Sequence, residues 1–435
     1  QGATVHGKGR PELRLADTVS FRHLGGFAVL VDHRSGRILR LSAAAGRLLH
    51  TLESGSLPVL DGEDRAFLEQ LAARGLLAGA TPVAERKYPT GGAATGGILD
   101  RINADAAAAR IPLHAQLEVT FRCPLSCRHC YLPPGASRAG TELSVEEIGQ
   151  LLDQLSALGG LFLLLTGGEP FARPDLRRIF DAARDRRFAV SLLTSGRGAD
   201  PALLDHMAAR GLDAIQVSLH GPDAATHDGF TGAAGSFDAA LWCMRRCRAL
   251  GIRTRAGLTV TRANIDSLAA TKALLDRESI PAALGLHLEP RRDGDRAPTS
   301  LAVDEAGVRR ALALFPPSSA TRMAGLGPDD TPCRAGSSVL AIDPFGTVYP
   351  CLSLRIPAGN AREEALAGIW SGSSVLERLR GLRVLDLEDC PTCEHRSHCD
   401  RCAGFAVGEG GSIRGHTAFD CLQARARQAL ELRTP

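Results

Sequence analysis

Apolar and polar residues follow a repeating strand–helix pattern between about residues 112 and 290 of the 435-residue chain. Strands are predicted at 114–120, 161–166, 188–195, 213–220, 252–261 and 283–290. Helical periodicity separates them at 144–160, 174–186, 201–210, 236–250 and 265–278, the first with a Ser144–Glu147 capping box. Six β–α repeats predict an α/β fold with a parallel sheet curled into a full or partial barrel. The chemistry of such barrels lies at the C-terminal ends of the strands.

The predicted strands have two chemically different faces. Residues 115, 117 and 119 of the first strand are apolar, whereas Gln116, Glu118 and Thr120 are polar, and 213–220 alternates in the same way. The apolar face should pack on helices and the polar face should line a lumen. The alternative to a polar lumen is that these polar residues lie only at the rim of the barrel. Five polar residues of the predicted lumen could act as acid–base groups or contact the substrate, or they could be structural residues of the barrel. None of them is assigned as catalytic. They are Glu118, Arg255, His287, Glu289 and Arg291.

The regions on either side of the repeats have different patterns. Residues 1–85 predict a strand, a turn at Gly36 and a second strand (27–32, 37–42), then helices at 43–52 and 63–77. This order is typical of a winged-helix module. A linker is expected over 86–112, the barrel over 113–300, and a bridging region with a cysteine-rich domain over 301–435, where 333–351 predicts a hairpin.

Composition excludes some functional classes. Charged residues make up 23% and apolar residues 44% of the chain, and the net charge is only +3. No bulk attraction to nucleic acid or membrane is indicated. No apolar run of membrane-spanning length and no signal-peptide pattern is present, so we expect a cytoplasmic protein without a nucleic-acid or membrane partner.

The twelve cysteines are grouped. Three lie at 123–130, and seven lie downstream, between 333 and 421. Their spacings suit metal or cluster ligands in a reducing compartment better than disulfides. Cys243 and Cys247 lie four residues apart on a predicted helix, where apolar packing is expected.

The first cysteine group directly follows the first barrel strand. Cys123, Cys127 and Cys130 can hold three irons of a 4Fe–4S cluster, leaving the fourth iron open to another ligand. A zinc site completed by His129 is the alternative. The next strand ends in "TGGEP" (166–170), where glycines permit close approach of a ligand and Glu169 can accept hydrogen bonds from an ammonium group.

Together these segments resemble the radical S-adenosylmethionine (SAM) superfamily. The matching motifs are CxxxCxxC followed by Tyr131, "GGEP" at 167–170, and the strand ends "LLTSG" (192–196) and "VSLHG" (217–221). Segments 227–241, 259–265 and 289–295 also match, so the resemblance covers about 113–295. It implies a partial (β/α)6 barrel in which SAM is contacted by residues at these motifs: Tyr131, Gly167, Gly168, Glu169, Pro170, Ser195 and Ser218. Most relatives have Asn where this chain has Ser195.

The resemblance also implies the chemistry. A reduced cluster cleaves SAM to a 5′-deoxyadenosyl radical, which abstracts hydrogen from an unactivated carbon, and the protein positions the reactants and excludes water. A flavodoxin or ferredoxin is the expected electron donor.

The downstream cysteines resemble the SPASM domain, which holds two auxiliary 4Fe–4S clusters. The family pattern implies one cluster on Cys390, Cys393, Cys399 and Cys421, and another on Cys333, Cys351 and Cys402. Three clusters are therefore expected in total. A zinc ribbon is the alternative.

The second of these auxiliary groups has one cysteine fewer than the fullest family pattern. Segment 325–332 contains no eighth cysteine, and the spacing before Cys402 is one residue shorter than is common. One iron is therefore expected to lack a protein thiolate. Asp329 or Asp330 can fill that position, and our sharper hypothesis is that a substrate cysteine binds there.

Residues 1–85 resemble the RiPP precursor recognition element, a winged-helix module similar to the PqqD family. The matching parts are 27–42, 48–55 and 68–77. The resemblance implies that a leader peptide binds as an added strand. Arg34, Arg37 and Arg40 would suit an acidic leader or simply form a solvated hairpin. A DNA-binding winged helix is disfavoured because 63–77 lacks a basic face.

These features predict a radical SAM peptide maturase. It would bind a precursor leader and install a cross-link in the core peptide, with a thioether favoured and a carbon–carbon bond next. The alternatives are a sulfatase-maturase-like enzyme oxidising a protein side chain, an enzyme acting on a small molecule, a peptide decarboxylase or epimerase, and a non-catalytic electron carrier, against which the intact "GGEP" argues.

Overall fold

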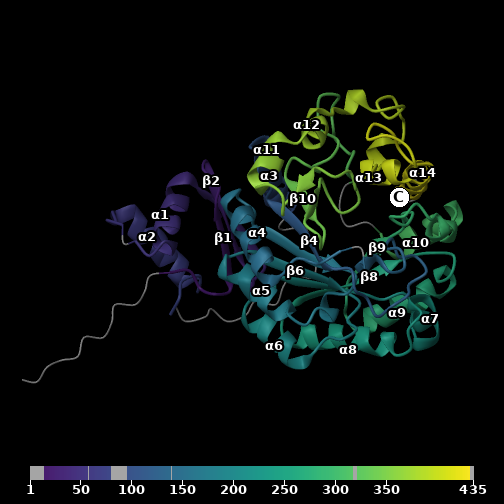
Figure 1. Ribbon diagram of the computed structural model, residues 1–435, viewed down its shortest axis with the longest axis horizontal. Coiled ribbons are helices and arrows are strands. Elements are labelled where there is room, and N and C mark those ends of the chain that lie inside the picture. The colour runs from purple at the N-terminus through teal and green to yellow at the C-terminus, as the bar shows by residue number, and fades with distance from the viewer. Residues whose placement is uncertain (1–13, 57, 80–95, 139, 317–320, 432–435) are drawn as a thin grey trace, which may run out of the picture. The chain divides into compact units, whose positions relative to one another are not determined.

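The computed structural model describes residues 14–56, 58–79, 96–138, 140–316 and 321–431. The chain divides into two compact units, 1–102 and 103–435, and each is described by itself. The element labels are those of Figure 1.

The first unit is an antiparallel sheet with helices. Its strands are β1 (Val19–His23), β2 (Phe27–Asp32) and β3 (Arg37–Ser42), in the order β1-β2-β3. Helix α1 (Ala43–Glu53) begins where the Ser42 hydroxyl accepts from the Ala45 amide, and α2 (Gly62–Ala73) begins at a capping box on Asp61. Leucines from both helices pack with β1 and β2 in one core.

Two details of this unit differ from expectation. Strand β1 was not predicted, because "VSFRH" has two polar residues at its end. The predicted helix 63–77 ends at Ala73, where the chain turns through Gly75 at a φ of 69°. The predicted strands 27–32 and 37–42 and the positive φ of Gly36 are confirmed.

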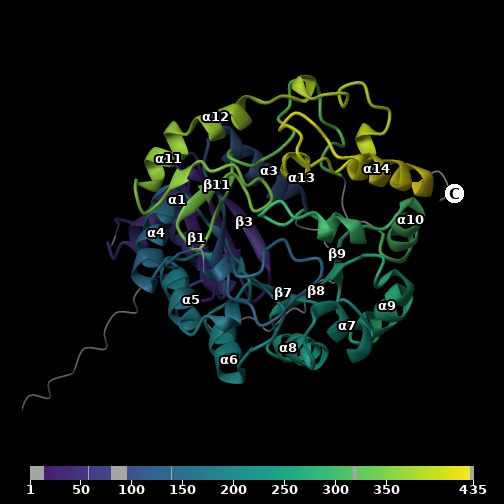
Figure 2. The same cartoon turned by 45° about the vertical axis from the view of Figure 1, so that its right-hand side comes forward.

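The second unit contains six consecutive parallel strands. They are β4 (His114–Thr120), β5 (Phe162–Gly167), β6 (Ala189–Thr194), β7 (Ala214–Ser218), β8 (Arg253–Thr259) and β9 (Ala282–Gly285), each paired with the next. The helices between them are α4 (Val145–Ala157), α5 (Leu176–Asp185), α6 (Pro201–Ala209), α7 (Ala224–Thr231), α8 (Ser236–Ala249) and α9 (Leu268–Arg277). In Figures 1 and 2 these helices form an arc around the strands. The α/β fold with a largely parallel sheet is confirmed.

The predicted alternation along the strands is also confirmed. Ala115, Leu117 and Val119 of β4 are buried in the core shared with the surrounding helices. The capping box of α4 has both hydrogen bonds, and Cys243 and Cys247 are buried in the same core. The apolar side chains of the strands are thus buried against the helices, and the polar side chains lie on the opposite face of the sheet.

The predicted hairpin at 333–351 extends this sheet. Strand β10 (Val339–Ile342) pairs parallel to β4, and β11 (Thr347–Tyr349) and β12 (Gly359–Asn360) follow antiparallel. Among the described residues the sheet has nine strands, in the order β12-β11-β10-β4-β5-β6-β7-β8-β9. The cysteine-rich region thereby adds strands next to β4, a pairing that local sequence pattern does not predict.

Helices account for most of the remaining regular structure. They are α3 (Gly96–Ala108), α10 (Glu305–Leu314), α11 (Leu366–Gly372), α12 (Ser374–Gly381), α13 (Ala403–Gly408) and α14 (Ala418–Glu431). Helix α3 lies where we expected a linker, over 86–112, of which 86–95 is outside the described residues. The strand expected at 283–290 stops at Gly285, so Glu289 lies beyond the sheet.

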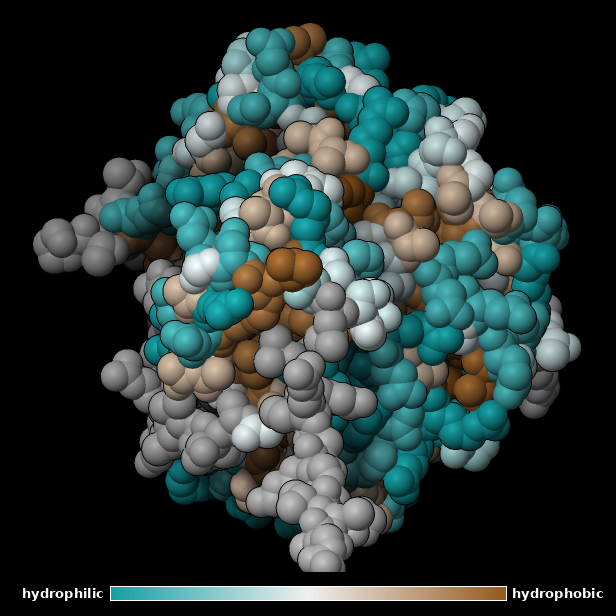
Figure 3. All heavy atoms as spheres, turned by 90° about the vertical axis from the view of Figure 1, so that its left-hand side faces the viewer, coloured by the Kyte–Doolittle hydropathy of each residue, from teal (hydrophilic) through white to brown (hydrophobic). Residues whose placement is uncertain are grey.

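Figure 3 shows one face of the molecule. Hydrophobic residues form patches among hydrophilic ones on the face in Figure 3. Within the described part of the chain, no helix is both long enough and apolar enough to cross a membrane.

Candidate functional site

The loop that carries the first three cysteines starts directly after β4. Hydrogen bonds from the Ser126 amide to the Thr231 carbonyl (2.9 Å) and from the Cys130 amide to the Cys127 carbonyl (3.1 Å) hold it. The three thiols lie close enough to influence one another. Burial, with the nearby thiols of Cys130 and Cys123, raises the pKa of Cys127 to about 12. These thiols therefore need a compensating positive charge to ionise, which an iron–sulfur cluster would supply.

The "GGEP" loop after β5 packs directly on the start of the cysteine loop. The Gly168 amide donates to the Thr120 carbonyl (2.7 Å) and the Glu169 amide to the Arg122 carbonyl (2.9 Å). A Cβ on Gly167 would lie 2.2 Å from the Thr120 oxygen, and one on Gly168 would lie 2.5 Å from the Arg122 oxygen. The described structure therefore requires both glycines for contact between two loops, whereas we had expected them to make room for a ligand.

The Glu169 side chain joins the ends of β5 and β6. It is fully buried and accepts hydrogen bonds from Thr194 Oγ1 (2.6 Å), the Phe171 amide (3.0 Å), and both the amide (2.7 Å) and the hydroxyl of Ser195. Burial raises the pKa of this carboxyl although these bonds oppose the shift. Four donors already occupy the carboxylate, so its contact with an ammonium group stays a prediction.

The other residues expected to contact SAM lie at neighbouring strand ends. Pro170 opens the short turn after Glu169, Ser195 follows β6, and Ser218 ends β7 and is half-buried. The parallel register of β5, β6 and β7 places these ends along one edge of the sheet.

A buried carboxylate connects the cysteine loop to the distant C-terminal region. Glu118 has no exposed surface and accepts from Tyr131 Oη (3.1 Å), Arg292 Nη2 (2.6 Å) and Arg355 Nη1 (3.0 Å). The Arg292 guanidinium also lies over the Tyr131 ring, 4.5 Å from its centroid. We did not predict Arg292 or Arg355. Their positions in the sequence could have indicated them. Arg292 directly follows the lumen candidate Arg291, and Arg355 lies four residues after Cys351.

The remaining lumen candidates have different environments. Burial raises the pKa of Glu289 to about 7, against an opposing hydrogen bond from Ser353. The His287 ring stacks on Phe405 with centroids 3.7 Å apart, and burial lowers its pKa to about 4. Arg291 pairs with Asp295. Burial lowers the pKa of Arg255.

His129 packs among aromatic rings. Its centroid lies 5.0 Å from that of His220 and 4.8 Å from that of Phe230. Burial lowers its pKa to about 4.

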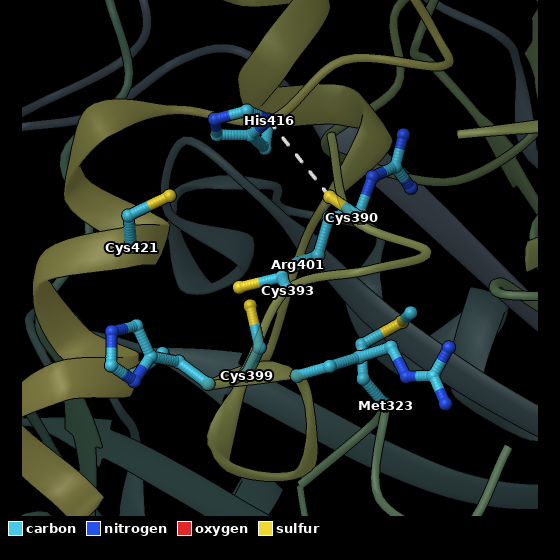
Figure 4. Close-up of a pocket in the computed structure, with 10 residues that line it drawn as sticks. Met323, Cys390, Cys393, Cys399, Arg401, His416 and Cys421 are labelled. Atoms are coloured by element: carbon cyan, nitrogen blue, oxygen red, sulfur yellow. Dashed lines mark hydrogen bonds between the residues drawn. The ribbon is translucent and has the colours of Figure 1, made fainter. Parts of the chain in front are cut away.

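Four of the downstream cysteines surround one pocket. Its empty space is about 360 Å³, and Cys390, Cys393, Cys399 and Cys421 line it with Met323 and Arg401 among others (Figure 4). His416 Nδ1 lies 3.9 Å from Cys390 Sγ. The donor set is four thiols from two separate segments around one space, which suits a 4Fe–4S cluster.

The other three downstream cysteines form a second group from three distant segments. Burial raises the pKa of Cys351 to about 12, and the thiols of Cys333 and Cys402 add to the shift. The Ala335 amide donates to Cys333 Sγ (3.4 Å) and the Leu354 amide to Cys351 Sγ (3.3 Å). The seven cysteines therefore lie in the two groups that the resemblance to the SPASM domain implied.

Comparisons with known proteins match two regions of this chain to described families. The radical SAM superfamily model matches residues 117–275, and the model of an iron–sulfur cluster-binding (SPASM) domain matches residues 333–403. A PqqA peptide cyclase of Streptomyces rochei is 32% identical over 325 residues, which cover 68% of this chain and 86% of that protein. The cyclase of Ruegeria pomeroyi is 31% identical, with coverage of 68% and 84%. An AdoMet-dependent heme synthase of Methanosarcina barkeri is 26% identical, covering 68% and 92%.

Solved structures share the fold. SuiB of Streptococcus suis bound to precursor peptide SuiA superposes with a TM-score of 0.61 at 14% identity, covering 94% of this chain and 99% of that one. The enzyme anSMEcpe with bound AdoMet and the Cp18Cys peptide gives 0.57 at 13% identity, covering 74% and 97%. The chain therefore belongs to the radical SAM superfamily and is an enzyme of the branch that carries a SPASM iron–sulfur domain.

Proposed function

We propose that this enzyme is a maturase that modifies a ribosomally made peptide. The observation that carries the proposal is that an N-terminal sheet with an edge strand precedes the radical SAM and SPASM regions in one chain. The relatives support it, because several are peptide cyclases and SuiB was solved with its precursor peptide.

The proposed cofactors are SAM and three 4Fe–4S clusters. The residues that fit the first cluster are Cys123, Cys127 and Cys130, and the downstream groups fit the other two. When bound and reduced, the first cluster and SAM supply a 5′-deoxyadenosyl radical. A flavodoxin or ferredoxin is the proposed electron donor. The protein's part is to hold SAM at the ends of β5, β6 and β7 and to exclude water.

Residues 1–85 are proposed to bind the leader peptide. Among the described residues β3 pairs with β2 on one side only, so its other edge is the place for an added strand. Arg37 and Arg40 on this strand are exposed and would suit an acidic leader, whereas Arg34 donates to the Gly75 carbonyl (2.7 Å). We propose 86–112 as the connection, 113–300 as the barrel, and 301–435 as the bridging and SPASM region.

The bond formed is proposed to be a cross-link, with a thioether favoured over a carbon–carbon bond. The Cys333, Cys351 and Cys402 group offers three thiolates, so a peptide cysteine can take the fourth position of its cluster. A cross-link removes two hydrogen atoms from the peptide.

Leader binding tests this proposal. The full chain should change the fluorescence anisotropy of a labelled leader, taken from the short peptide encoded beside the enzyme. Replacing Arg37 by Glu should weaken binding on the order of tenfold, because a repulsive charge would face an acidic strand. Arg310→Gln, on α10, serves as the control. Specific binding of labelled duplex DNA without leader binding would refute the recognition role.

A further inference from the structure

Strand β8 has two faces that differ in chemistry. Ala256 lies in the apolar core that the sheet shares with the surrounding helices. Successive residues of a strand point to opposite faces, so Arg253 and Arg255 lie on the other face, where both are exposed. The polar face that the sequence predicted for this sheet therefore carries two arginines on β8.

The neighbouring strand β7 places a carboxamide beside Arg255. In the parallel register, Gln216 pairs with Arg255 and Ser218 pairs with Gly257. Val217 is buried in the apolar core, so Gln216 and Ser218 share the polar face with Arg255. A Cβ on Gly257 would lie 2.7 Å from Gln216 Nε2. The Gln216 side chain therefore lies across β8, two residues along the strand from Arg255.

Two carboxylates of this part of the barrel are paired with other cations. Glu118 accepts hydrogen bonds from two arginines outside the strands. Asp213 pairs with Arg253. In the part of the chain that the structure describes, neither a carboxylate nor another hydrogen-bond acceptor pairs with the Arg255 guanidinium. Arg255 is therefore a cation whose charge is not neutralised within the described chain.

The environment of Arg255 favours an anionic ligand. Partial burial lowers the pKa of its guanidinium, and Arg253 acts in the same direction. A desolvated cation without a counter-charge costs folding free energy, and a bound anion relieves that cost. The planar guanidinium suits a carboxylate, because it donates two parallel hydrogen bonds to the two oxygens. A carboxylate is therefore the group that fits this position.

The position of Arg255 separates it from the proposed SAM contacts. Ser218 ends β7 at the edge of the sheet where SAM is proposed to bind. Arg255 lies two residues before Gly257, the partner of Ser218, which puts it about 7 Å further from the strand ends at about 3.3 Å per residue. The polar face behind the strand ends is thereby available to the peptide that must meet the 5′-deoxyadenosyl radical.

We propose that Arg255 and Gln216 bind a carboxylate of the peptide substrate, next to the residue that is modified. The carboxylate belongs either to an aspartate or glutamate side chain of the core peptide or to its C-terminus. Arg255 then determines specificity, because a peptide with an amide in place of this carboxylate leaves the cation unpaired. This inference rests on the proposed function of a peptide maturase.

The test uses precursor peptides that differ in one carboxylate. The starting peptide is the short one encoded beside the enzyme. Each Asp or Glu of its core is replaced in turn by Asn or Gln, and one further peptide has an amidated C-terminus. Mass spectrometry of peptide mixtures gives the relative kcat/KM of each peptide with the full-length enzyme. One of these changes should lower kcat/KM at least tenfold, and its identity shows which carboxylate is bound.

Variants of the enzyme show whether this discrimination depends on Arg255. Arg255→Gln should lower kcat/KM for the starting peptide at least tenfold and abolish the discrimination between acid and amide. Arg255→Lys keeps the charge and should keep part of the discrimination. Gln216→Glu supplies a carboxylate to Arg255 within the chain, so it should also weaken the discrimination, and it serves as the test if Arg255→Gln does not fold. Arg310→Gln removes an exposed arginine of α10 and should discriminate as the wild type does.

Two results would overturn the inference while leaving the proposed function intact. One is equal kcat/KM for all acid and amide peptides with the wild-type enzyme, and the other is full discrimination by Arg255→Gln. SAM also carries a carboxylate, so its Kd is measured by equilibrium dialysis with the same variants. A tenfold weaker SAM Kd in Arg255→Gln, with unchanged peptide discrimination, would assign the cation to SAM instead. A wild-type enzyme that modifies none of the peptides would refute the proposed function, and this inference with it.

Discussion

Glu118 is a fully buried carboxylate near the end of β4. It pairs with Arg292 and Arg355, each about one-fifth exposed, while it has no exposure itself. Glu118→Ala would leave two desolvated guanidiniums without this partner. We expect the free energy of unfolding to fall by about 3–5 kcal/mol, measured by chemical denaturation.

An exposed glutamate provides the matched control. Glu377 pairs with Arg110 and Arg380, but its side chain is 42% exposed. Glu377→Gln should cost less than about 1 kcal/mol. Equal losses for the two variants would contradict the central position of Glu118.

The Glu289 carboxyl should make the free energy of unfolding depend on pH. Its pKa of about 7 in the folded chain exceeds the ordinary value of 4.5, so the folded state holds the proton more tightly. This contribution is fully present below pH 4.5 and is lost as the pH rises through 7. Replacing Glu289 by Gln should therefore increase Tm, relative to the wild type, more at pH 8 than at pH 5. The corresponding change in the free energy of unfolding between these two pH values should be at most about 3 kcal/mol.

The same comparison with Glu377→Gln should show no such dependence. If the difference in Tm between the wild type and Glu289→Gln is the same at pH 5 and at pH 8, the Glu289 carboxyl does not titrate in this range.

Residue types and spacing predicted the cysteine groups but not the partners of the buried charges. The motif around Glu169 was visible in the sequence, yet its four hydrogen bonds come from residues that the fold brings to it. Arg292 and Arg355 meet at Glu118 across long sequence separations. Such pairs depend on tertiary packing, which a local pattern does not contain.

At the scale of elements, the "GGEP" loop lies directly against the cysteine loop. Gly168→Ala would place a methyl group against the Arg122 carbonyl and move one loop relative to the other. We expect SAM cleavage, measured as 5′-deoxyadenosine release, to slow on the order of 10- to 100-fold.

Gly381→Ala is the control for this substitution. A Cβ there meets nothing within 4 Å. Wild-type cleavage by the Gly168→Ala variant would show that the loop contact does not position the site.

Element prediction succeeded where hydrophobic periodicity was strong. All six parallel strands begin within a few residues of their expected positions, and so do the five predicted helices between them. Helix α7 was missed because eight residues give little periodic signal, and the end of β9 was overestimated because apolar alternation continues to Leu288. The pairing of β10 with β4 depends on distant chain segments.

At the scale of the whole molecule, the proposed function depends on three groups of cysteines, and the members of the two downstream groups are far apart in the sequence. The fold gathers residues 333, 351 and 402 into one group and four others around one pocket. Spacing marked these cysteines as ligand candidates, and the resemblance to the SPASM domain supplied their division into two groups. The proposed peptide substrate is a separate molecule, so no motif of this chain predicts its sequence or the bond that we propose.

Mass spectrometry of the precursor peptide tests the central claim most directly. The short peptide encoded beside the enzyme would be co-expressed with the full chain and compared with the same peptide expressed alongside the Cys127→Ala variant. The account predicts a loss of two hydrogen atoms per modification, present only with the wild-type enzyme. An unchanged peptide mass, or a loss matching the removal of a carboxyl group, would contradict cross-link formation.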